Sequence, residues 1–93
     1  MIVSFACKDT QRVASGRFSK RLPQQIQRRA KMRLDRIDAA RDLDDLRVPP
    51  SHRLEALSGD RLGFHSVRIN DQWRIVFRWE QGGAHDVAIV DYH

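Results

Sequence analysis

The most regular pattern in this chain is an alternation of apolar and polar residues between Phe64 and Trp79. Its second half reads Trp-Arg-Ile-Val-Phe-Arg-Trp, which places the tryptophans, the isoleucine and the phenylalanine on one face and the arginines and the valine on the other. Alternation of this kind is typical of half-buried β-strands. Because Asn-Asp-Gln separates the two alternating runs, the pattern predicts a β-hairpin.

The register of this hairpin follows from the need to keep the apolar residues on one face. A three-residue loop pairs Ile69 with Trp73 and Arg68 with Arg74, whereas a two-residue turn pairs Arg68 with Ile75 and mixes the faces. The pattern therefore predicts the three-residue loop. Two opposed arginines repel each other by about 0.5 kcal/mol, and an anion such as phosphate would stabilise them. A solvated outer face with the two side chains spread apart explains the same pattern, so both interpretations stay open.

Helical periodicity predicts a long amphipathic helix from Pro23 to about Ala40. Ile26, Ala30, Leu34 and Ile37 recur every three or four residues and form its buried stripe. Five arginines and lysines occupy much of its remaining surface, which either binds an anionic partner or is simply solvated. The other predicted elements are a strand over Met1 to Ala6, a short helix from its cap Asp9 to Ser15, a helical turn from Asp42 to Leu46, and strands over Leu54 to Leu57 and Asp86 to Val90.

The order of these elements, β-α-α-β-β-β-β, predicts the fold class. It indicates an α+β domain in which an N-terminal strand and the helices pack on one face of a small, mostly antiparallel sheet and leave the other face available. The 93 residues have room for one modest core, so we expect a single domain over residues 1–93. No apolar run approaches the length of a membrane span. The single cysteine, Cys7, excludes an internal disulfide and fits a cytoplasmic protein.

The charge balance indicates an anionic partner. The chain contains 17 lysines and arginines against 12 aspartates and glutamates, for a formal net charge of +5. Nucleic acid and an acidic protein segment both fit this balance. The four histidines lack ligand-like spacing, and the sequence has no Gly-rich phosphate loop, so we expect neither a metal nor another cofactor.

Candidate chemistry lies in the last three residues, Asp91, Tyr92 and His93. The α-carboxylate beside the imidazole of His93 favours the protonated form, which suits a general acid. Tyr92 can donate a hydrogen bond or stack on a base. In a regular strand Tyr92 faces away from Asp91 and His93. A functional tail therefore predicts a bend after Val90, and a structural tail predicts regular pairing through Tyr92.

Two segments together resemble the HigB-type toxins, a branch of the RelE/ParE superfamily of bacterial type II toxin–antitoxin modules. They are the stretch from Leu57 to Phe77, with its Asn-Asp-Gln-Trp-Arg-Ile core, and the final Val-Asp-Tyr-His. The likeness extends to the chain length, the N-terminal Met-Ile-x-Ser-Phe and the strand order. It implies a RelE-like fold and an endoribonuclease that cleaves messenger RNA on the ribosome, without a metal, through attack of the ribose 2′-OH on the adjacent phosphate.

The resemblance also implies roles for individual residues. The phosphate-contacting arginine of the family and its C-terminal catalytic triplet match Arg74, Asp91, Tyr92 and His93. A basic residue after Gly-Asp matches Arg61, and two further arginines lie on the predicted face of Arg74, so we expect RNA to be bound by Arg61, Arg68 and Arg78. Some family members carry a histidine and a lysine where this chain has Glu55 and Ser58, which implies weaker or altered cleavage.

The resemblance implies partners as well. They are a helix-turn-helix antitoxin of the HigA kind, the ribosome with its messenger RNA, and operator DNA reached only through the antitoxin complex; no membrane is involved. Two alternatives remain. One is a toxin that binds DNA gyrase without being a nuclease, although toxins of that kind generally lack the arginine–tyrosine–histidine set. The other is a ribosome or RNA binder with weakened catalysis.

Overall fold

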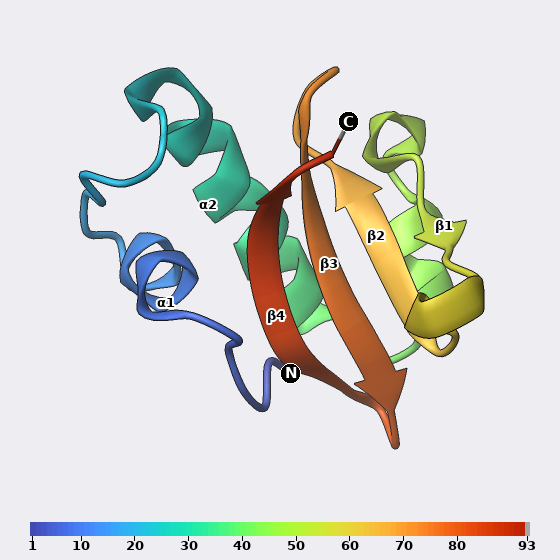
Figure 1. Cartoon of the computed structure of the whole chain (residues 1–93). Coiled ribbons are helices and arrows are strands. Elements are labelled where there is room, and N and C mark those ends of the chain that lie inside the picture. Colours follow the sequence, from blue (N-terminus) through green and yellow to red (C-terminus); the bar gives the residue numbers. More distant parts are fainter. Residues whose placement is uncertain (93) are drawn as a thin grey trace.

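The molecule has two layers, one a β-sheet and the other helical (Figure 1). The computed structural model describes residues 1–92, and in this part of the chain four strands form an antiparallel sheet in the order β1-β2-β3-β4. The strands are β1 (Glu55–Ala56), β2 (Phe64–Arg68), β3 (Trp73–Glu80) and β4 (Gly83–Asp91). Helix α2 (Gln24–Ala39) packs across β3 and β4, and α1 (Lys8–Ala14) packs against α2 and β4. The predicted α+β class is confirmed.

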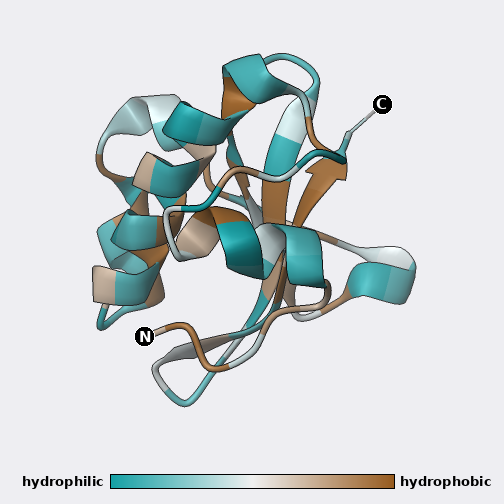
Figure 2. Ribbon diagram, turned by 90° about the vertical axis from the view of Figure 1, so that its left-hand side faces the viewer, coloured by the Kyte–Doolittle hydropathy of each residue, from teal (hydrophilic) through white to brown (hydrophobic). Residues whose placement is uncertain are grey.

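The core lies between α2 and the sheet. The predicted stripe of Ile26, Ala30, Leu34 and Ile37 is buried, with at most 3% of each residue exposed. Figure 2 shows hydrophobic segments in the strands, and helices that are hydrophilic along much of their length. In the strands, the large apolar side chains of Val67, Ile75, Phe77 and Val87 are fully buried. Each such aliphatic or aromatic side chain contributes about 1.5–3 kcal/mol through removal from water.

Three short 3₁₀ helices line the connection between α2 and β2. They are η1 (Leu43–Arg47), η2 (Pro50–His52) and η3 (Gly59–Arg61). The first begins with a reciprocal capping box between Asp42 and Asp45, which agrees with the predicted helical turn. No helix within residues 1–92 combines the length and the hydropathy needed to cross a bilayer.

The β2–β3 hairpin has the predicted three-residue loop. Arg68 pairs with Arg74 across the two strands. The side-chain oxygen of Asn70 accepts hydrogen bonds from the backbone N–H groups of Gln72 (2.8 Å) and Trp73 (2.7 Å). An asparagine in this position closes the turn on its own backbone, so the loop fixes the register that opposes the two arginines.

The N-terminal segment is less regular than the predicted strand over residues 1–6. Ile2 and Phe5 form two isolated parallel bridges, to Ala84 and Val87 of β4. Between these bridges β4 bulges, with a φ of +53° at Asp86. A bulge interrupts the ladder and twists the strand, so the segment follows β4 without becoming a continuous fifth strand.

Two further boundaries differ from the prediction. Cys7, and not Asp9, is the N-cap of α1, and the Asp9 carboxylate instead accepts a hydrogen bond from the Ser19 hydroxyl (2.8 Å). The last strand begins three residues earlier than predicted. Gln81 and Gly82 both have positive φ (50° and 75°), as a two-residue type I′ turn requires, and pairing therefore starts at once after the turn.

Candidate active site on the open face of the sheet

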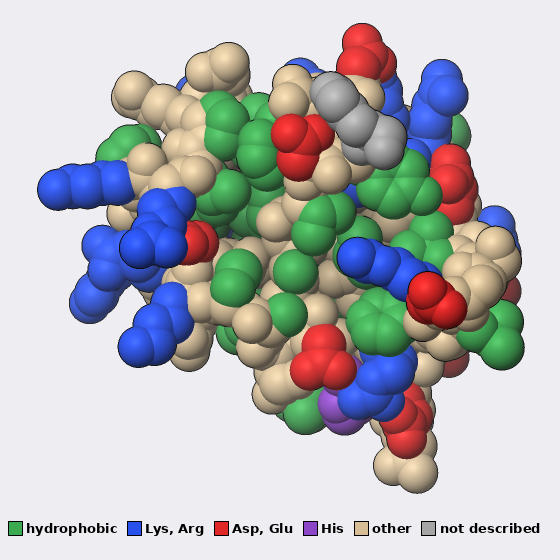
Figure 3. All heavy atoms as spheres, viewed as in Figure 1, with side chains coloured by type: hydrophobic (Ala, Val, Ile, Leu, Met, Phe, Trp, Pro, Cys, Tyr) green, Lys and Arg blue, Asp and Glu red, His purple; other side chains and the backbone are tan. Residues whose placement is uncertain are grey.

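The face of the sheet that points away from α2 carries the candidate site. Strand pairing places Arg68 of β2, Arg74 of β3 and Val90 of β4 in one row across this face. Glu55 of β1 and Ser66 of β2 lie in the neighbouring row. Figure 3, which views this face, shows basic, acidic and hydrophobic side chains close together on it. The arginines that the sequence pattern assigned to the outer face do lie there.

Arg74 is the most enclosed charged residue of this face, with 8% of its surface exposed. Its Nη2 donates to the backbone oxygen of Arg53 at 2.6 Å, and its Nη1 lies 3.3 Å from Oε1 of Glu55. Arg53 has left-handed backbone angles (φ 44°, ψ 56°), a conformation that costs a non-glycine residue about 1–3 kcal/mol. The guanidinium is therefore held in one orientation by groups from the β1 side of the sheet.

Tyr92 lies against Arg74. The Arg74 Cζ atom is 5.2 Å from the centroid of the tyrosine ring, within the range of a cation–π interaction. The Tyr92 backbone N–H donates to the Gln72 oxygen at 2.6 Å, which keeps the tail beside the hairpin. Tyr92 is 40% exposed, so it remains accessible to a ligand.

Asp91 lies on the other face of the sheet. It pairs with Trp73, whose side chain points toward the helices, and its carboxylate accepts a hydrogen bond from the Gln72 amide at 3.1 Å. The strand stays regular through Asp91, and up to Tyr92 the bend predicted for a functional tail is not formed. Of the predicted triplet, alternation thus brings Tyr92 to Arg74 and directs Asp91 away. The third member, His93, lies outside the described residues.

Two arginines of α2 support the end of β2 behind this face. Arg29 Nη1 donates to the Ile69 oxygen at 3.3 Å, and Arg33 Nε donates to the Arg68 oxygen at 3.2 Å. Burial is the main cause that lowers the pKa of Arg33 below its usual value, and the positive charges of Arg29, Arg36 and Arg68 lower it further. This crowding of guanidinium groups makes the Arg68 end of the sheet electropositive.

The other predicted RNA-binding arginines occupy different places. Arg68 forms an exposed ion pair with Asp71 in the hairpin loop. Arg78 lies four residues beyond Arg74, about 13 Å along the strand, and forms ion pairs with Glu80 and Asp86, the latter at 3.5 Å. Arg61 is exposed in η3, beside the beginning of β2. The structure therefore places Arg68 opposite Arg74, at the end of the sheet where Tyr92 contacts Arg74, and leaves Arg61 and Arg78 nearer the opposite end.

The open face also contains buried polar atoms without partners. Arg74 Nε and Ser66 Oγ have no hydrogen-bond partner within residues 1–92. An unsatisfied buried group of this kind costs about 1–3 kcal/mol, and such groups call for an explanation such as a ligand site. In the same part of the chain, no three His, Cys, Asp or Glu side chains gather closely enough to hold a metal ion.

Comparison with known proteins decides the family. The model of a family described as the RelE-like toxin of type II toxin–antitoxin system HigB matches residues 5–93. This chain belongs to the HigB-like toxin family. Toxin HigB-1 of Vibrio cholerae is 40% identical over 63 residues, which are 68% of this chain and 66% of that relative. Endoribonuclease HigB of Proteus vulgaris is 32% identical over 93 residues, the full length of both chains.

Membership in the HigB-like family has two consequences for the site. A type II toxin has an antitoxin partner, so this HigB-like toxin has a second protein, an antitoxin, as its partner. The match to the Proteus relative spans the whole chain, so the open face lies within the matched region. The residues around Arg74 also lie within residues 5–93, which the family model matches.

The sequence of this HigB-like toxin did not predict that Glu55 lies at the site. The sequence shows this position only as a departure from the histidine that some family members carry. The carboxylate nevertheless reaches Arg74 because β1 pairs with β2 and sets Glu55 opposite Ser66. A strand of two residues has too little alternation to give a signal, so only the tertiary pairing of β1 places Glu55.

Proposed function

We propose that this chain is a ribosome-dependent endoribonuclease that inhibits translation by cutting messenger RNA. The observation that carries the proposal is the enclosed guanidinium of Arg74, held by Glu55 and the Arg53 oxygen and covered on one side by Tyr92. A preorganised guanidinium on an open surface is suited to a phosphate whose charge grows in the transition state. The name of the Proteus vulgaris relative, Endoribonuclease HigB, supports the same chemistry.

The proposed reaction is transesterification within the RNA. The ribose 2′-oxygen attacks the neighbouring phosphorus, and the bond to the 5′-oxygen breaks, which leaves a cyclic phosphate and a free 5′-OH. Arg74, with Arg68 beside it, stabilises the charge on the phosphate. Tyr92 stacks on a base or orients it, and His93 gives a proton to the departing 5′-oxygen. Asp91 acts from the opposite face. Its carboxylate accepts a hydrogen bond from the Gln72 side chain, and the Gln72 backbone oxygen in turn accepts one from Tyr92, so Asp91 helps to position the tail.

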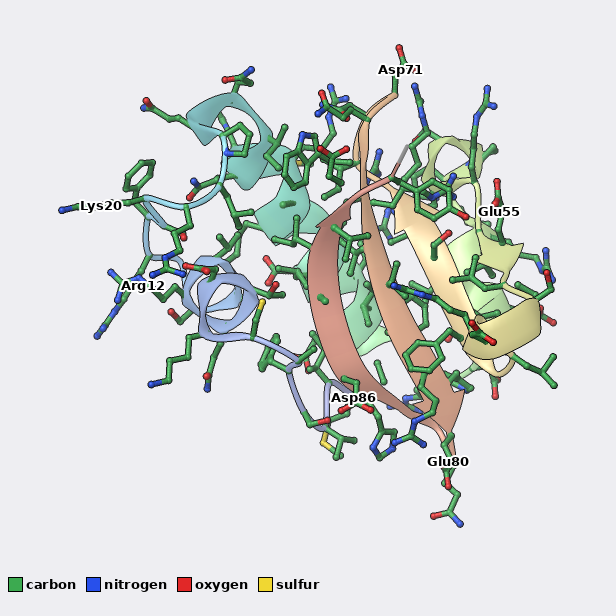
Figure 4. All side chains as sticks on the ribbon, in the orientation of Figure 1. Arg12, Lys20, Glu55, Asp71, Glu80 and Asp86 are labelled. Carbon is green, nitrogen blue, oxygen red and sulfur yellow. The ribbon has the colours of Figure 1, made fainter. Side chains whose placement is uncertain are left out.

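The distribution of charge supports docking on ribosomal RNA through the helical layer. Residues 8–36 contain ten basic and two acidic side chains, a net +8, whereas the rest of the chain contains seven basic and ten acidic ones, a net −3. In residues 8–36, the exposed basic side chains that form no ion pair within the described part of the chain are Lys8, Arg12, Arg17, Lys20, Arg21, Arg28, Arg29 and Arg36. Arg12 and Lys20 project from the edge of the molecule opposite Glu55 (Figure 4).

Unpaired positive charge of this kind attracts a polyanion from a distance and binds its phosphates without regard to sequence. The helical layer would then hold the ribosomal RNA while the open sheet face receives the message. Arg61 and Arg78 would contact the message beyond the reacting phosphate. The proposed setting is the bacterial cytoplasm, with a helix-turn-helix antitoxin of the HigA kind as the inhibitor and operator DNA bound only by the toxin–antitoxin complex.

The proposal is tested by sequencing RNA ends after brief induction of the full chain and by single-turnover cleavage on purified translating ribosomes. We expect cuts within translated messages and little cleavage of naked RNA. Arg74→Ala should lower the cleavage rate about 100- to 1000-fold, and deletion of His93 should lower it strongly as well. Arg47→Ala, which removes an exposed ion pair with Asp44, is the matched control and should cut normally.

Undiminished cleavage by both Arg74→Ala and the His93 deletion would remove the catalytic assignment. Stalled ribosomes without new RNA ends would instead indicate a binder with weakened catalysis. Inhibition of supercoiling by the purified chain, without RNA cleavage, would favour a gyrase poison.

A further inference from the structure

A carboxylate contacts the enclosed guanidinium of the proposed site. Oε1 of Glu55 is 3.3 Å from Nη1 of Arg74, and the Glu55 side chain is 51% exposed while that of Arg74 is 9% exposed. One oxygen of the carboxylate thus faces the guanidinium, and the side chain borders solvent on the open face. Figure 4 shows Glu55 on β1 at the margin of this face.

The other acidic groups of the described chain are elsewhere. Asp91 projects on the helix side of the sheet. Asp71 pairs with Arg68 at the hairpin tip, and Glu80 and Asp86 pair with Arg78 toward the other end of β3. Within residues 1–92, Glu55 is therefore the one carboxylate that contacts Arg74.

Two of the described histidines, like the other acidic groups, lie away from Arg74 and are not placed for proton transfer there. His52 is 1% exposed, and its Nδ1 lies 3.1 Å from the Leu46 oxygen. His65 pairs with Phe77 and stacks on its ring on the helix side of the sheet. The base that removes the 2′-OH proton must lie within about 3.2 Å of that hydroxyl, and neither imidazole is on the required face.

The geometry of the reaction places this hydroxyl near Glu55. The attacking oxygen stands about 3–3.5 Å from phosphorus in a reactive arrangement. When Arg74 binds the phosphate, the 2′-OH therefore lies next to the guanidinium. The Glu55 carboxylate already contacts this guanidinium, so it lies close to the 2′-OH as well. The buried Ser66 Oγ, opposite Glu55 and without a partner within residues 1–92, is a further polar atom in this row.

We propose that Glu55 is the general base of the cleavage reaction, an inference that rests on the proposed function. The 2′-O–H bond breaks and its proton passes to a carboxylate oxygen of Glu55 as the bond between the 2′-oxygen and phosphorus forms. The bond between phosphorus and the 5′-oxygen breaks, and that oxygen takes a proton from His93. No other reactant is consumed. Before RNA binds, the ion pair with Arg74 keeps the carboxylate in position for this transfer.

The test compares the full-length wild-type chain with Glu55→Gln and Glu55→Asp in single-turnover cleavage of ribosome-bound message. Glutamine keeps the shape of the side chain but cannot accept the proton, so we expect the rate to fall about 100-fold or more with ribosome affinity unchanged. Aspartate should restore part of the rate.

Glu80→Gln is the matched control, because Glu80 also pairs with an arginine on this face but lies at the far end of β3. It should cleave like the wild type. Equal cleavage by Glu55→Gln and the wild type would overturn the inference and leave the endoribonuclease standing. Faster cleavage by Glu55→Gln would overturn it too, by showing that the carboxylate only competes with phosphate for Arg74. Absence of cleavage by the wild type would overturn the proposed function and this inference together.

Discussion

The ring of Tyr92 lies over the guanidinium of Arg74, with 5.2 Å between the Arg74 Cζ atom and the ring centroid. Arg74 lies in β3 and Tyr92 directly follows β4, and the two meet because Arg74 pairs with Val90, two residues before the tyrosine on the same face. This contact joins the tail to the hairpin arginine. It also leaves the outer side of the ring free to meet a base.

Removing the ring should separate its catalytic effect from its effect on stability. Tyr92→Ala should lower cleavage at least 10-fold, because the base loses its stacking partner. It should reduce the free energy of unfolding by no more than about 1 kcal/mol, since the cation–π contact is partly exposed. Cleavage assays and urea denaturation measure the two effects. Tyr92→Phe keeps the ring and is the control; if it is as defective as Tyr92→Ala, the hydroxyl and not the stacking surface is what matters.

The hairpin loop should depend on one asparagine. Asn70→Ala removes the acceptor of two backbone hydrogen bonds and should lower the free energy of unfolding by about 1–2 kcal/mol. Asp71→Ala, in the same loop, removes only an exposed ion pair with Arg68 and should cost about 0.5 kcal/mol or less. Urea unfolding of both variants measures this. Equal losses would mean that the loop register does not rest on Asn70.

Stability should fall on mild acidification because of His52. Burial lowers the pKa of this imidazole below its usual value, although its hydrogen bond to the Leu46 oxygen opposes the shift. A group with a depressed folded-state pKa contributes its full stabilisation above the unfolded value of about 6.5 and loses it as pH falls toward the folded value. We expect the free energy of unfolding to decrease below about pH 6.5, and to decrease less steeply in His52→Asn. If the free energies of unfolding of the wild type and of His52→Asn changed with pH in the same way, His52 would not be the cause of the acid destabilisation.

Charge reversal on the helical layer should weaken docking without affecting the chemical step. Arg12→Glu combined with Lys20→Glu should lower ribosome affinity and reduce the dependence of binding on salt. The single-turnover rate at saturating ribosome should stay the same, because neither residue lies on the open sheet face. Arg47→Glu, on a 3₁₀ helix near the sheet, is the control. A reduced saturating rate in the double variant would show that the helical layer also shapes the reactive site.

Local patterns predicted the elements whose residues repeat regularly. The hairpin register and α2 follow from alternation and from the helical stripe, because burial of one face decides both. The N-terminal strand was only partly right, since the bulge at Asp86 interrupts its pairing with β4. Alternation also predicted that Asp91 and Tyr92 would diverge. Glu55 could not be placed at Arg74, because its position depends on the pairing of a two-residue strand with a distant one.

The separation of charge between the two layers gives the protein an electrical polarity. A small body in which residues 8–36 have a net charge of +8 and the rest of the chain a net charge of −3 turns in the field of a polyanion before it touches it. It would therefore arrive at RNA helices-first, and its reactive surface would point outward toward whatever strand passes over it. The orientation of the toxin when it reaches RNA would then be set by residues that take no part in cleavage. Mutations in those residues would change the binding position on the RNA without changing the cleavage rate.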